Sequence, residues 1–232
     1  KLNQPIVGMA VGRAADPYAV GDQGYDISFP QCGAAYPPSA PFGIVGVNNG
    51  RAFTHNPCFA SEATWAGPSL SIYMNLNAPP SGSAQGLSGP AGQCAPTDTG
   101  CMAYNYGYNA AADAHAYAAA SGASASVWWI DVETANSWDA NTSNNGRTIQ
   151  GALDALGAAG DVAGIYSTPY QWGIIAGGYA PKTPIWLATG ADYSTAAAFC
   201  SPSHGFGGGA IWLTQYGTAG VPYDQDLACA PS

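Results

Sequence analysis

Short, unbroken runs of apolar residues recur along the chain, and they limit its possible folds more than any other feature. Each run is apolar at nearly every position instead of alternating with polar residues, which is typical of parallel strands buried on both faces. We expect such strands at residues 24–28, 43–47, 70–74, 127–132, 162–166, 184–188 and 210–213.

Helical patterns lie between some of these runs. Residues 105–121 are rich in Ala and end before Gly122, and residues 144–159 carry apolar residues at helical spacing and end before Gly160. This order predicts βαβ units, and about eight buried strands predict a closed barrel of the α/β class. After Ala188 the helical signal fades.

The whole chain, residues 1–232, is expected to form a single barrel domain. Residues 1–22 show little periodicity and are expected to form an N-terminal arm. Residues 79–96 are rich in Pro, Gly and Ser, and we expect them to leave the barrel as a surface excursion.

Charged residues make up only 8% of the chain, and its net charge is −9 with five Lys and Arg. These basic residues are scattered, so the sequence offers no basic patch for nucleic acid or for an anionic membrane surface. The apolar runs are also shorter than the roughly 20 residues that span a membrane. We expect a monomer that binds neither nucleic acid nor membranes.

Six cysteines, an even number in a chain with few charges, favour disulfide bonds in a secreted, extracellular protein. Proximity along the chain favours the pairs Cys94–Cys101, Cys32–Cys58 and Cys200–Cys229. A metal site is the alternative, but no C-x-x-C pair occurs and the three histidines lie far apart in sequence. We expect no metal and no cofactor.

Acidic residues stand at the carboxyl ends of several predicted strands, where β/α barrels carry their chemistry. Asp26 lies late in the first strand, and Asp226 follows the last strand that contains Trp. Asp131 and Glu133 close the fourth strand. Residues at i and i+2 of a strand point to the same face, with Cα atoms roughly 6.7 Å apart. Both carboxylates are therefore expected to enter one pocket.

Burial beside a second carboxylate raises a carboxyl pKa, so one acid of such a pair can stay protonated while the other remains ionised. A glycoside hydrolase needs this division between a proton donor and an anion. The alternative is that Asp131 or Glu133 caps the next helix or pairs with Arg147. The acids at other strand ends favour the catalytic interpretation.

Taken together, these motifs resemble those of the glycoside hydrolase family 25 lysozymes, over residues 24–228. Residues 25–31, YDISFPQ, are similar to the opening Asp-x-Ser-x-x-Gln of that family, and residues 130–133, IDVE, to its central Asp-x-Glu. Residues 164–167, GIYS, followed by Trp172, are similar to its fifth-strand motif. Residues 212–216, WLTQY, and 224–226, DQD, are similar to its closing motifs.

The resemblance implies an irregular, TIM-like barrel of eight strands and about five helices. It also implies cleavage of the β-1,4 bond between N-acetylmuramic acid and N-acetylglucosamine. Glu133 takes the position of the proton donor, and Asp131 that of its partner, acting on the acetamido group or as a base. Asp26 and Asp226 fall at the flanking acidic positions.

A glycan groove is expected beside these acids. Its expected contacts are Tyr73, Asn75, Tyr166, Trp186, Gln215 and Tyr216. Aromatic rings stack on sugar faces, but barrel cores also use aromatic residues, so packing inside the barrel is the alternative for each ring.

The chain departs from the family after its second and third strands. A basic residue and Ala-Thr-Glu-Gly are usual after the second strand, whereas residues 47–51 read VNNGR. The third strand usually ends in Tyr-His-Phe, whereas residues 73–75 read YMN. Neutral amides at these positions predict a weaker dependence on carboxylates of the substrate. Two alternatives stay open: a hydrolase of a different cell-wall polysaccharide, and a non-catalytic glycan-binding module on the same barrel.

Overall fold

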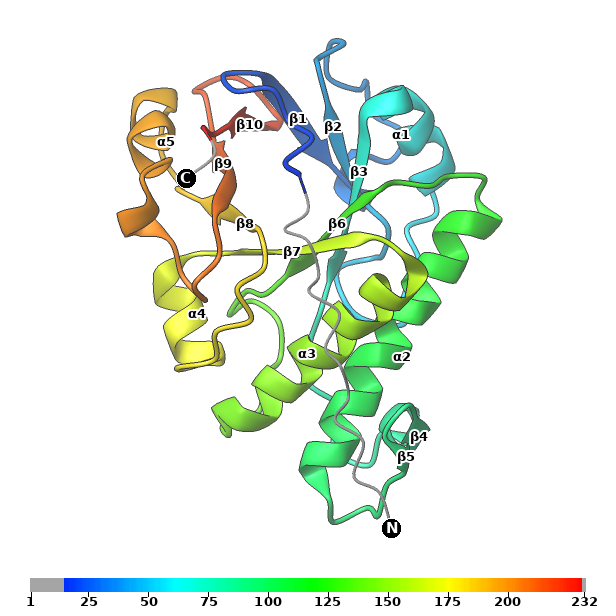
Figure 1. Ribbon diagram of the computed structural model, residues 1–232. Helices are drawn as coiled ribbons and strands as arrows, with labels where there is room; N and C mark the ends of the chain where they lie inside the picture. The colour runs from blue at the N-terminus through cyan, green and yellow to red at the C-terminus, as the bar shows by residue number, and fades with distance from the viewer. Residues whose placement is uncertain (1–14, 231–232) are drawn as a thin grey trace.

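The computed structural model describes residues 15–230, and within them eight strands close a barrel (Figure 1). Around the barrel the strand order is β1-β10-β9-β8-β7-β6-β3-β2. The strands are β1 (Gln23–Ile27), β2 (Gly43–Gly46), β3 (Leu70–Asn75), β6 (Val127–Asp131), β7 (Val162–Ser167), β8 (Ile185–Ala188), β9 (Ile211–Tyr216) and β10 (Asp224–Ala228). The predicted α/β barrel is confirmed.

One strand corrects the expectation of a parallel sheet. β10 runs antiparallel to both of its neighbours, β1 and β9, while the other neighbouring strands pair in parallel. The chain between β9 and β10 covers only residues 217–223, which is too short for the crossover that a parallel neighbour requires. The start of β10 therefore lies at the same end of the barrel as the carboxyl ends of the other strands.

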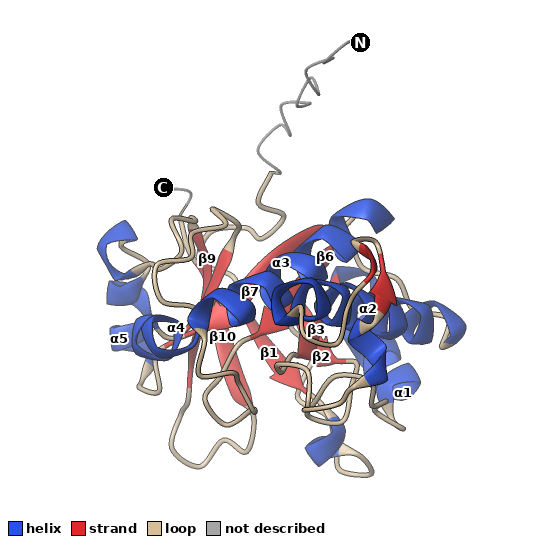
Figure 2. Ribbon diagram, turned by 90° about the horizontal axis from the view of Figure 1, so that it is seen from below, coloured by secondary structure: helices blue, strands red, loops and turns tan. Residues whose placement is uncertain are grey.

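Five α-helices occur in the described part of the chain, in agreement with the expected number. They are α1 (Phe59–Ala66), α2 (Thr99–Ala120), α3 (Thr142–Ala159), α4 (Pro169–Ile175) and α5 (Tyr193–Phe199). The side chain of Asn141 caps α3 by accepting a hydrogen bond from Ser143 N at 3.0 Å, and Gly160 ends it in a left-handed conformation. Figure 2 shows α3 and α2 against the same side of the barrel.

Short elements complete the chain. The 3₁₀ helices are η1 (Phe29–Gln31), η2 (Gly67–Ser69), η3 (Ala84–Gly86) and η4 (Pro202–His204). The predicted excursion at 79–96 contains η3 and a small hairpin of β4 (Ser88–Gly89) and β5 (Gly92–Gln93). The Cys94–Cys101 disulfide ties it to α2, and the pairs Cys32–Cys58 and Cys200–Cys229 also form as predicted.

Most strands are largely buried on both faces, as the unbroken apolar runs predict, whereas β1 begins at the exposed Gln23 and β10 at the exposed Asp224. The outward face packs against the helices through side chains such as Val45, Ile72, Ile130, Ile165 and Leu187. The inward face fills the barrel with aromatic rings, above all Trp129 and Trp186. Gly164 makes room for this filling, since a Cβ there would lie 2.3 Å from the Trp129 ring.

The N-terminal arm closes the lower end of the barrel, where the parallel strands begin. Tyr18 is buried there, its ring centroid lies 4.9 Å from that of Phe42, and its hydroxyl lies 2.6 Å from Ser71 Oγ. Trp129 Nε1 donates a hydrogen bond to the same hydroxyl at 3.2 Å. Residues 1–14 of the predicted arm lie outside the described residues. The upper end of the barrel, where the acids gather, is the end left for a ligand.

No helix within residues 15–230 is long and apolar enough to cross a membrane.

Candidate active site

Five carboxyl groups gather at the upper end of the barrel. Asp26 on β1 pairs in register with Asp224 on β10, and Asp131 ends β6 with Glu133 just beyond it. Asp226 follows β9, the last strand that contains Trp, as expected, but it lies inside a further strand, β10, opposite Gly24 and Gln215 and below the mouth. The antiparallel course of β10 causes this difference.

Asp131 is the most enclosed member of the predicted pair, with only 4% of its surface exposed. Its Oδ2 atom accepts a hydrogen bond from Asn75 Nδ2, and its Oδ1 atom is buried without a partner. Burial raises the pKa of Asp131 well above its usual value, and the nearby charge of Glu133 raises it further.

Asn75 is itself fixed by Asn48. Asn48 Nδ2 donates to the Asn75 carbonyl at 2.9 Å, and Asn75 N donates to Asn48 Oδ1 at 3.1 Å. The Asn48 side chain is buried, and both its nitrogen and its oxygen are engaged by these two bonds. Of the two amides expected at the groove after the second strand, Asn48 therefore supports β3, while Asn49 is exposed and stays a candidate for a ligand contact.

Glu133 is only partly buried, and its loop is held from two sides. Trp138 Nε1 donates to the Glu133 carbonyl at 2.8 Å, and Gln171 Nε2 approaches Glu133 Oε1 at 3.5 Å. Gln171 Oε1 accepts from Thr134 N at 2.6 Å and from Thr134 Oγ1 at 2.9 Å. The Glu133 carboxylate thus lies at the mouth. Trp138 holds the backbone of this residue, and the Gln171 amide orients one carboxylate oxygen.

A chain of hydrogen bonds holds Asp26 on the opposite wall. Tyr166 donates to Gln215 Oε1 at 2.7 Å, and Gln215 Nε2 donates to Asp26 Oδ2 at 2.9 Å. Burial raises the pKa of Asp26 to about 7, the charge of Asp224 adds to this, and the bond from Gln215 opposes it. At neutral pH this carboxyl is therefore divided between its two protonation states.

Asp226 lies fully buried beneath the mouth. Trp186 Nε1 donates to its Oδ1 at 2.7 Å, and its Oδ2 has no partner. Burial raises the pKa of Asp226 well above its usual value, with a further contribution from Asp26. Among the described residues no Lys or Arg forms an ion pair with any of these acids. Instead, the raised pKa values of the buried acids favour their protonated forms, which lowers the negative charge of the cluster.

Four of the six expected substrate contacts face the upper interior of the barrel: Tyr73, Asn75, Tyr166 and Gln215. Trp186 and Tyr216 do not fit the expectation that their rings stack on sugars. Trp186 is 2% exposed and lies beneath Tyr166, with ring centroids 4.5 Å apart. Tyr216 follows Gln215, so it points to the outer face of β9, where it is 3% exposed and donates to Gln23 Oε1 at 2.6 Å.

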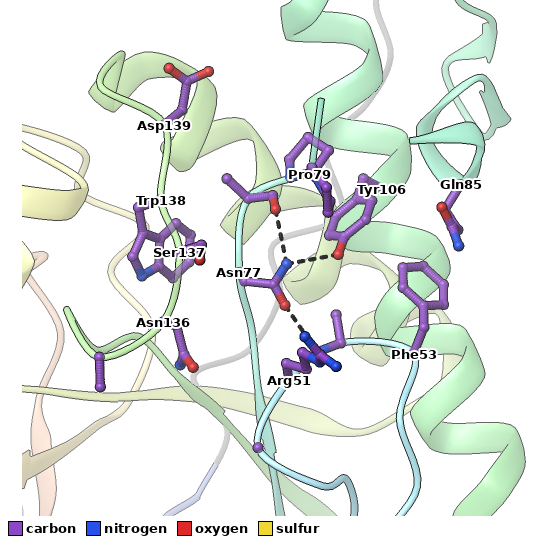
Figure 3. A pocket seen from close by; sticks show the side chains of 15 residues that line it. Arg51, Phe53, Asn77, Pro79, Gln85, Tyr106, Asn136, Ser137, Trp138 and Asp139 are labelled. Atoms are coloured by element: carbon purple, nitrogen blue, oxygen red, sulfur yellow. Dashed lines mark hydrogen bonds between the residues drawn. The ribbon is translucent and has the colours of Figure 1, made fainter. Parts of the chain in front are cut away.

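A hollow of about 680 Å³ lies between the segments that follow β3 and β6 (Figure 3). Residues 135–139 form one wall, and Phe53 and Tyr106 belong to the other. None of the five acids lines it, but its lining residues Asn77 and Ala135 each stand two positions after a site residue, Asn75 and Glu133. Among the described residues no group of three or more His, Cys, Asp or Glu is arranged to hold a metal ion.

Sequence reasoning missed Gln171 and Asp224 as members of the site. Gln171 stands three residues after the α4 N-cap Thr168, a spacing that predicts a capping box. Its side chain instead reaches across to residues 133–134, which no local pattern reveals. Asp224 belongs to the DQD motif, but only the orientation of β10 shows that it comes to lie beside Asp26.

A closed β/α barrel with paired carboxyls at its upper end defines a class of glycoside hydrolase-like barrels. A family model described as "Lysozyme-like protein 1" matches residues 99–208, which include Asp131, Glu133 and Gln171. The chain is 30% identical over 97 residues to the probable GH family 25 lysozyme 4 of Dictyostelium discoideum. That match spans 40% of this chain and 39% of the relative.

Solved structures cover far more of the chain. The catalytic domain of endolysin ply40 from Listeria monocytogenes bacteriophage P40 superposes with a TM-score of 0.55 at 15% identity, covering 92% of this chain and 95% of that one. A family 25 glycosyl hydrolase from Bacillus anthracis gives 0.50 at 13% identity, covering 96% and 95%. The Cpl-1 endolysin, complexed with a peptidoglycan analogue, gives 0.52 at 13%, covering 92% and 55%. The chain has the fold of the family 25 glycoside hydrolases.

Proposed function

We propose that the chain is a glycoside hydrolase that cleaves bacterial peptidoglycan, at the β-1,4 bond between N-acetylmuramic acid and N-acetylglucosamine. The observation that carries the proposal is the pair at the end of β6. The enclosed Asp131, held by Asn75, stands beside the more exposed Glu133, whose loop is anchored at the mouth by Trp138 and Gln171. The likeness to lysozymes and endolysins supports the same reaction class.

In this proposal Glu133 donates a proton to the bridging oxygen as the bond to the anomeric carbon breaks. The positive charge that develops on the sugar faces the carboxyl cluster, which stabilises it when Asp131 or Asp26 is ionised. A water molecule then adds to the anomeric carbon, and a carboxylate of the cluster takes the proton that this water loses. Asn75 orients Asp131, and Gln171 orients Glu133, throughout these steps.

We also infer that the protein acts outside the cell, as a monomer with one barrel domain. Three disulfides within residues 15–230 favour an oxidising compartment. The monomeric state is a prediction that sedimentation of the purified chain tests.

The deciding experiment is incubation with purified peptidoglycan, followed by mass spectrometry of the new reducing ends. Muramic acid at those ends supports the proposal, and Glu133→Gln should release none above background. Glucosamine ends, or turnover only on another wall polysaccharide, would point to a different hydrolase. Binding without turnover on every wall preparation would point to a glycan-binding module.

A further inference from the structure

The hollow of Figure 3 is lined by a positively charged side chain that forms no ion pair with an acid in the described part of the chain. Arg51 lines it, is exposed, and forms no ion pair with any residue that the structure describes. The chain has only five basic residues at a net charge of −9, so an unpaired Arg in this hollow is unexpected on composition alone. Burial raises the pKa of Tyr106, and the hydrogen bond with Asn77 and the charge of Arg51 oppose this rise.

The segment that carries Arg51 is held in one conformation. The buried Asn77 accepts a hydrogen bond from Ala52 N at 3.0 Å and donates to the Tyr106 hydroxyl at 2.8 Å. Phe53 adopts a φ of 58°, which is rare for an aromatic residue, and its ring meets Tyr106 with centroids 5.1 Å apart (Figure 3). Backbone in such a conformation persists only where its surroundings fix it, and it is common at ligand sites.

Hydrogen bonds tie the walls of the hollow to each other and to the loop that carries Glu133. Ala78 N donates to the Ser137 carbonyl at 2.9 Å, which joins its two walls. Trp138 lines the hollow and also donates to the Glu133 carbonyl at 2.8 Å. The hollow is therefore next to the segment that positions the proposed proton donor, within the length of a glycan substituent.

The hollow also contains one acid, Asp139, but its carboxylate is already used. Oδ1 accepts from Asn141 N at 2.9 Å, and Oδ2 accepts from Asn144 Nδ2 at 2.9 Å. Figure 3 shows this carboxylate turned away from Arg51, at the far end of the loop. Its charge does not compete for the guanidinium.

We propose that this hollow is a subsite for a carboxylate-bearing substituent of the glycan, with Arg51 as its anion-binding group. The inference rests on the proposed function and adds the chemistry of a substituent next to the cleaved bond. Arg presents several N–H donors that match a carboxylate, while Phe53, Tyr106 and Trp138 supply apolar walls for the carbon atoms that carry it. It is opposed to the sequence-based expectation of weak dependence on substrate carboxylates, and the kinetics below decide between the two.

The carboxylate has two possible sources: the carboxyl of the lactyl group on the sugar, which is free where no peptide is attached, and a carboxyl of the attached peptide. Three glycans separate them: intact stem-bearing glycan, glycan freed of peptide but retaining the lactyl carboxyl, and the same glycan with that carboxyl reduced to an alcohol. Initial rates give kcat and KM for the wild type, Arg51→Gln and Arg51→Lys. Arg147→Gln is the matched control, because it removes the same charge from α3, outside this hollow.

Arg51→Gln should raise KM about tenfold on carboxylate-bearing glycan, with kcat unchanged, since charge-assisted hydrogen bonds are the stronger ones. Arg51→Lys should recover part of the loss, and the reduced glycan should not distinguish the variants. A loss confined to stem-bearing glycan assigns the peptide carboxyl, and a loss confined to stem-free glycan assigns the lactyl carboxyl, which is free only after the peptide has been removed. A loss on both shows that the subsite accepts either carboxylate. Equal KM values for Arg51→Gln and wild type on both, or an equal loss on the reduced glycan, would overturn the subsite.

The subsite can still be tested if the proposed function is wrong. If the wild type cleaves none of the three glycans, calorimetric binding of the same glycans to wild type and Arg51→Gln tests the subsite alone. Binding that is weakened by Arg51→Gln only for carboxylate-bearing glycan supports it. Binding that is identical for both proteins, or absent, refutes it.

Discussion

Gln171 on α4 places its Nε2 atom 3.5 Å from Oε1 of Glu133, while its Oε1 atom accepts two hydrogen bonds from Thr134. One amide therefore fixes both the backbone that follows Glu133 and the direction of its carboxylate. Gln171 is a positioning residue in the proposed reaction, and it acts through Glu133 rather than on the substrate.

Gln171→Ala should lower kcat about tenfold, since a misplaced acid transfers its proton less efficiently. KM should stay within about twofold, because Gln171 does not line the groove. The neighbouring Tyr170→Ala, which truncates an exposed ring on the same helix, is the control and should leave both constants unchanged. A rise in KM with an unchanged kcat would contradict the positioning role.

Glu133→Gln should lower kcat by roughly 10²–10⁴, because the amide keeps the shape of the side chain but donates no proton of suitable acidity. Asp131→Asn should also lose most of the activity through loss of charge beside the sugar. Steady-state rates on peptidoglycan, with thermal unfolding to confirm the fold, check both variants. Glu133→Gln that keeps more than about a tenth of the wild-type rate would remove Glu133 from the role of proton donor.

The protonated cluster predicts that the folded protein is more stable in mild acid than at neutral pH. The folded pKa of Asp26 is raised to about 7, so between about pH 4 and 7 the unfolded chain has lost a proton that the folded chain still holds. Stability is therefore highest near the lower value and falls as pH rises through the folded pKa. Asp131 and Asp226, whose pKa values are also raised, act in the same direction.

Urea unfolding at pH 5 and pH 8 measures this effect. Asp26→Asn should be more stable than wild type at pH 8 by about 1–2 kcal/mol, after allowance for the water that reaches its side chain at the mouth, and less so at pH 5. Asp192→Asn is the control with the opposite expected effect on stability. Hydrogen bonds at the start of α5 lower the pKa of Asp192, so removing this carboxylate should not stabilise the protein at pH 8. A wild type whose stability rises from pH 5 to pH 8 would show that the cluster does not hold its protons.

Trp186→Phe tests whether this ring lies below the groove. The change removes the N–H that satisfies Asp226, so it should cost about 1–3 kcal/mol of unfolding free energy. KM should stay close to the wild-type value, since the ring is 2% exposed. Tyr166→Phe is the matched control at the mouth, because it removes the hydroxyl that donates to Gln215. A large rise in KM for Trp186→Phe with unchanged stability would show that the Trp186 ring contacts the substrate in the groove.

Much of the fold was predictable because seven strands are buried on both faces, which leaves continuous apolar runs in the sequence. The direction of β10 was not predictable from composition, because it depends on the short connection at 217–223. Helix α1 carries mostly small and polar residues over eight positions, so its sequence shows no helical spacing of apolar residues. The helices that were predicted, α2 and α3, are the long ones.

The site was predictable to the extent that it follows from strand geometry. Asp131, Glu133 and Asp26 come together because parallel strands end at one edge. The depth of each aromatic residue could not be predicted. A ring on an inward strand position either reaches the groove, as Tyr166 does, or lies beneath it, as Trp186 does. Which of the two occurs depends on how the side chains fill the barrel.

Tyr18 has a consequence for the acids at the other end of the barrel. Its ring and hydroxyl, with Trp129 and Ser71, pack across the lower end of the barrel, so the carboxyl cluster meets solvent on the side of the mouth. A glycan seated over the mouth takes the place of that solvent. In the proposed reaction the cluster then exchanges protons mainly with the bound glycan and with the water that attacks it.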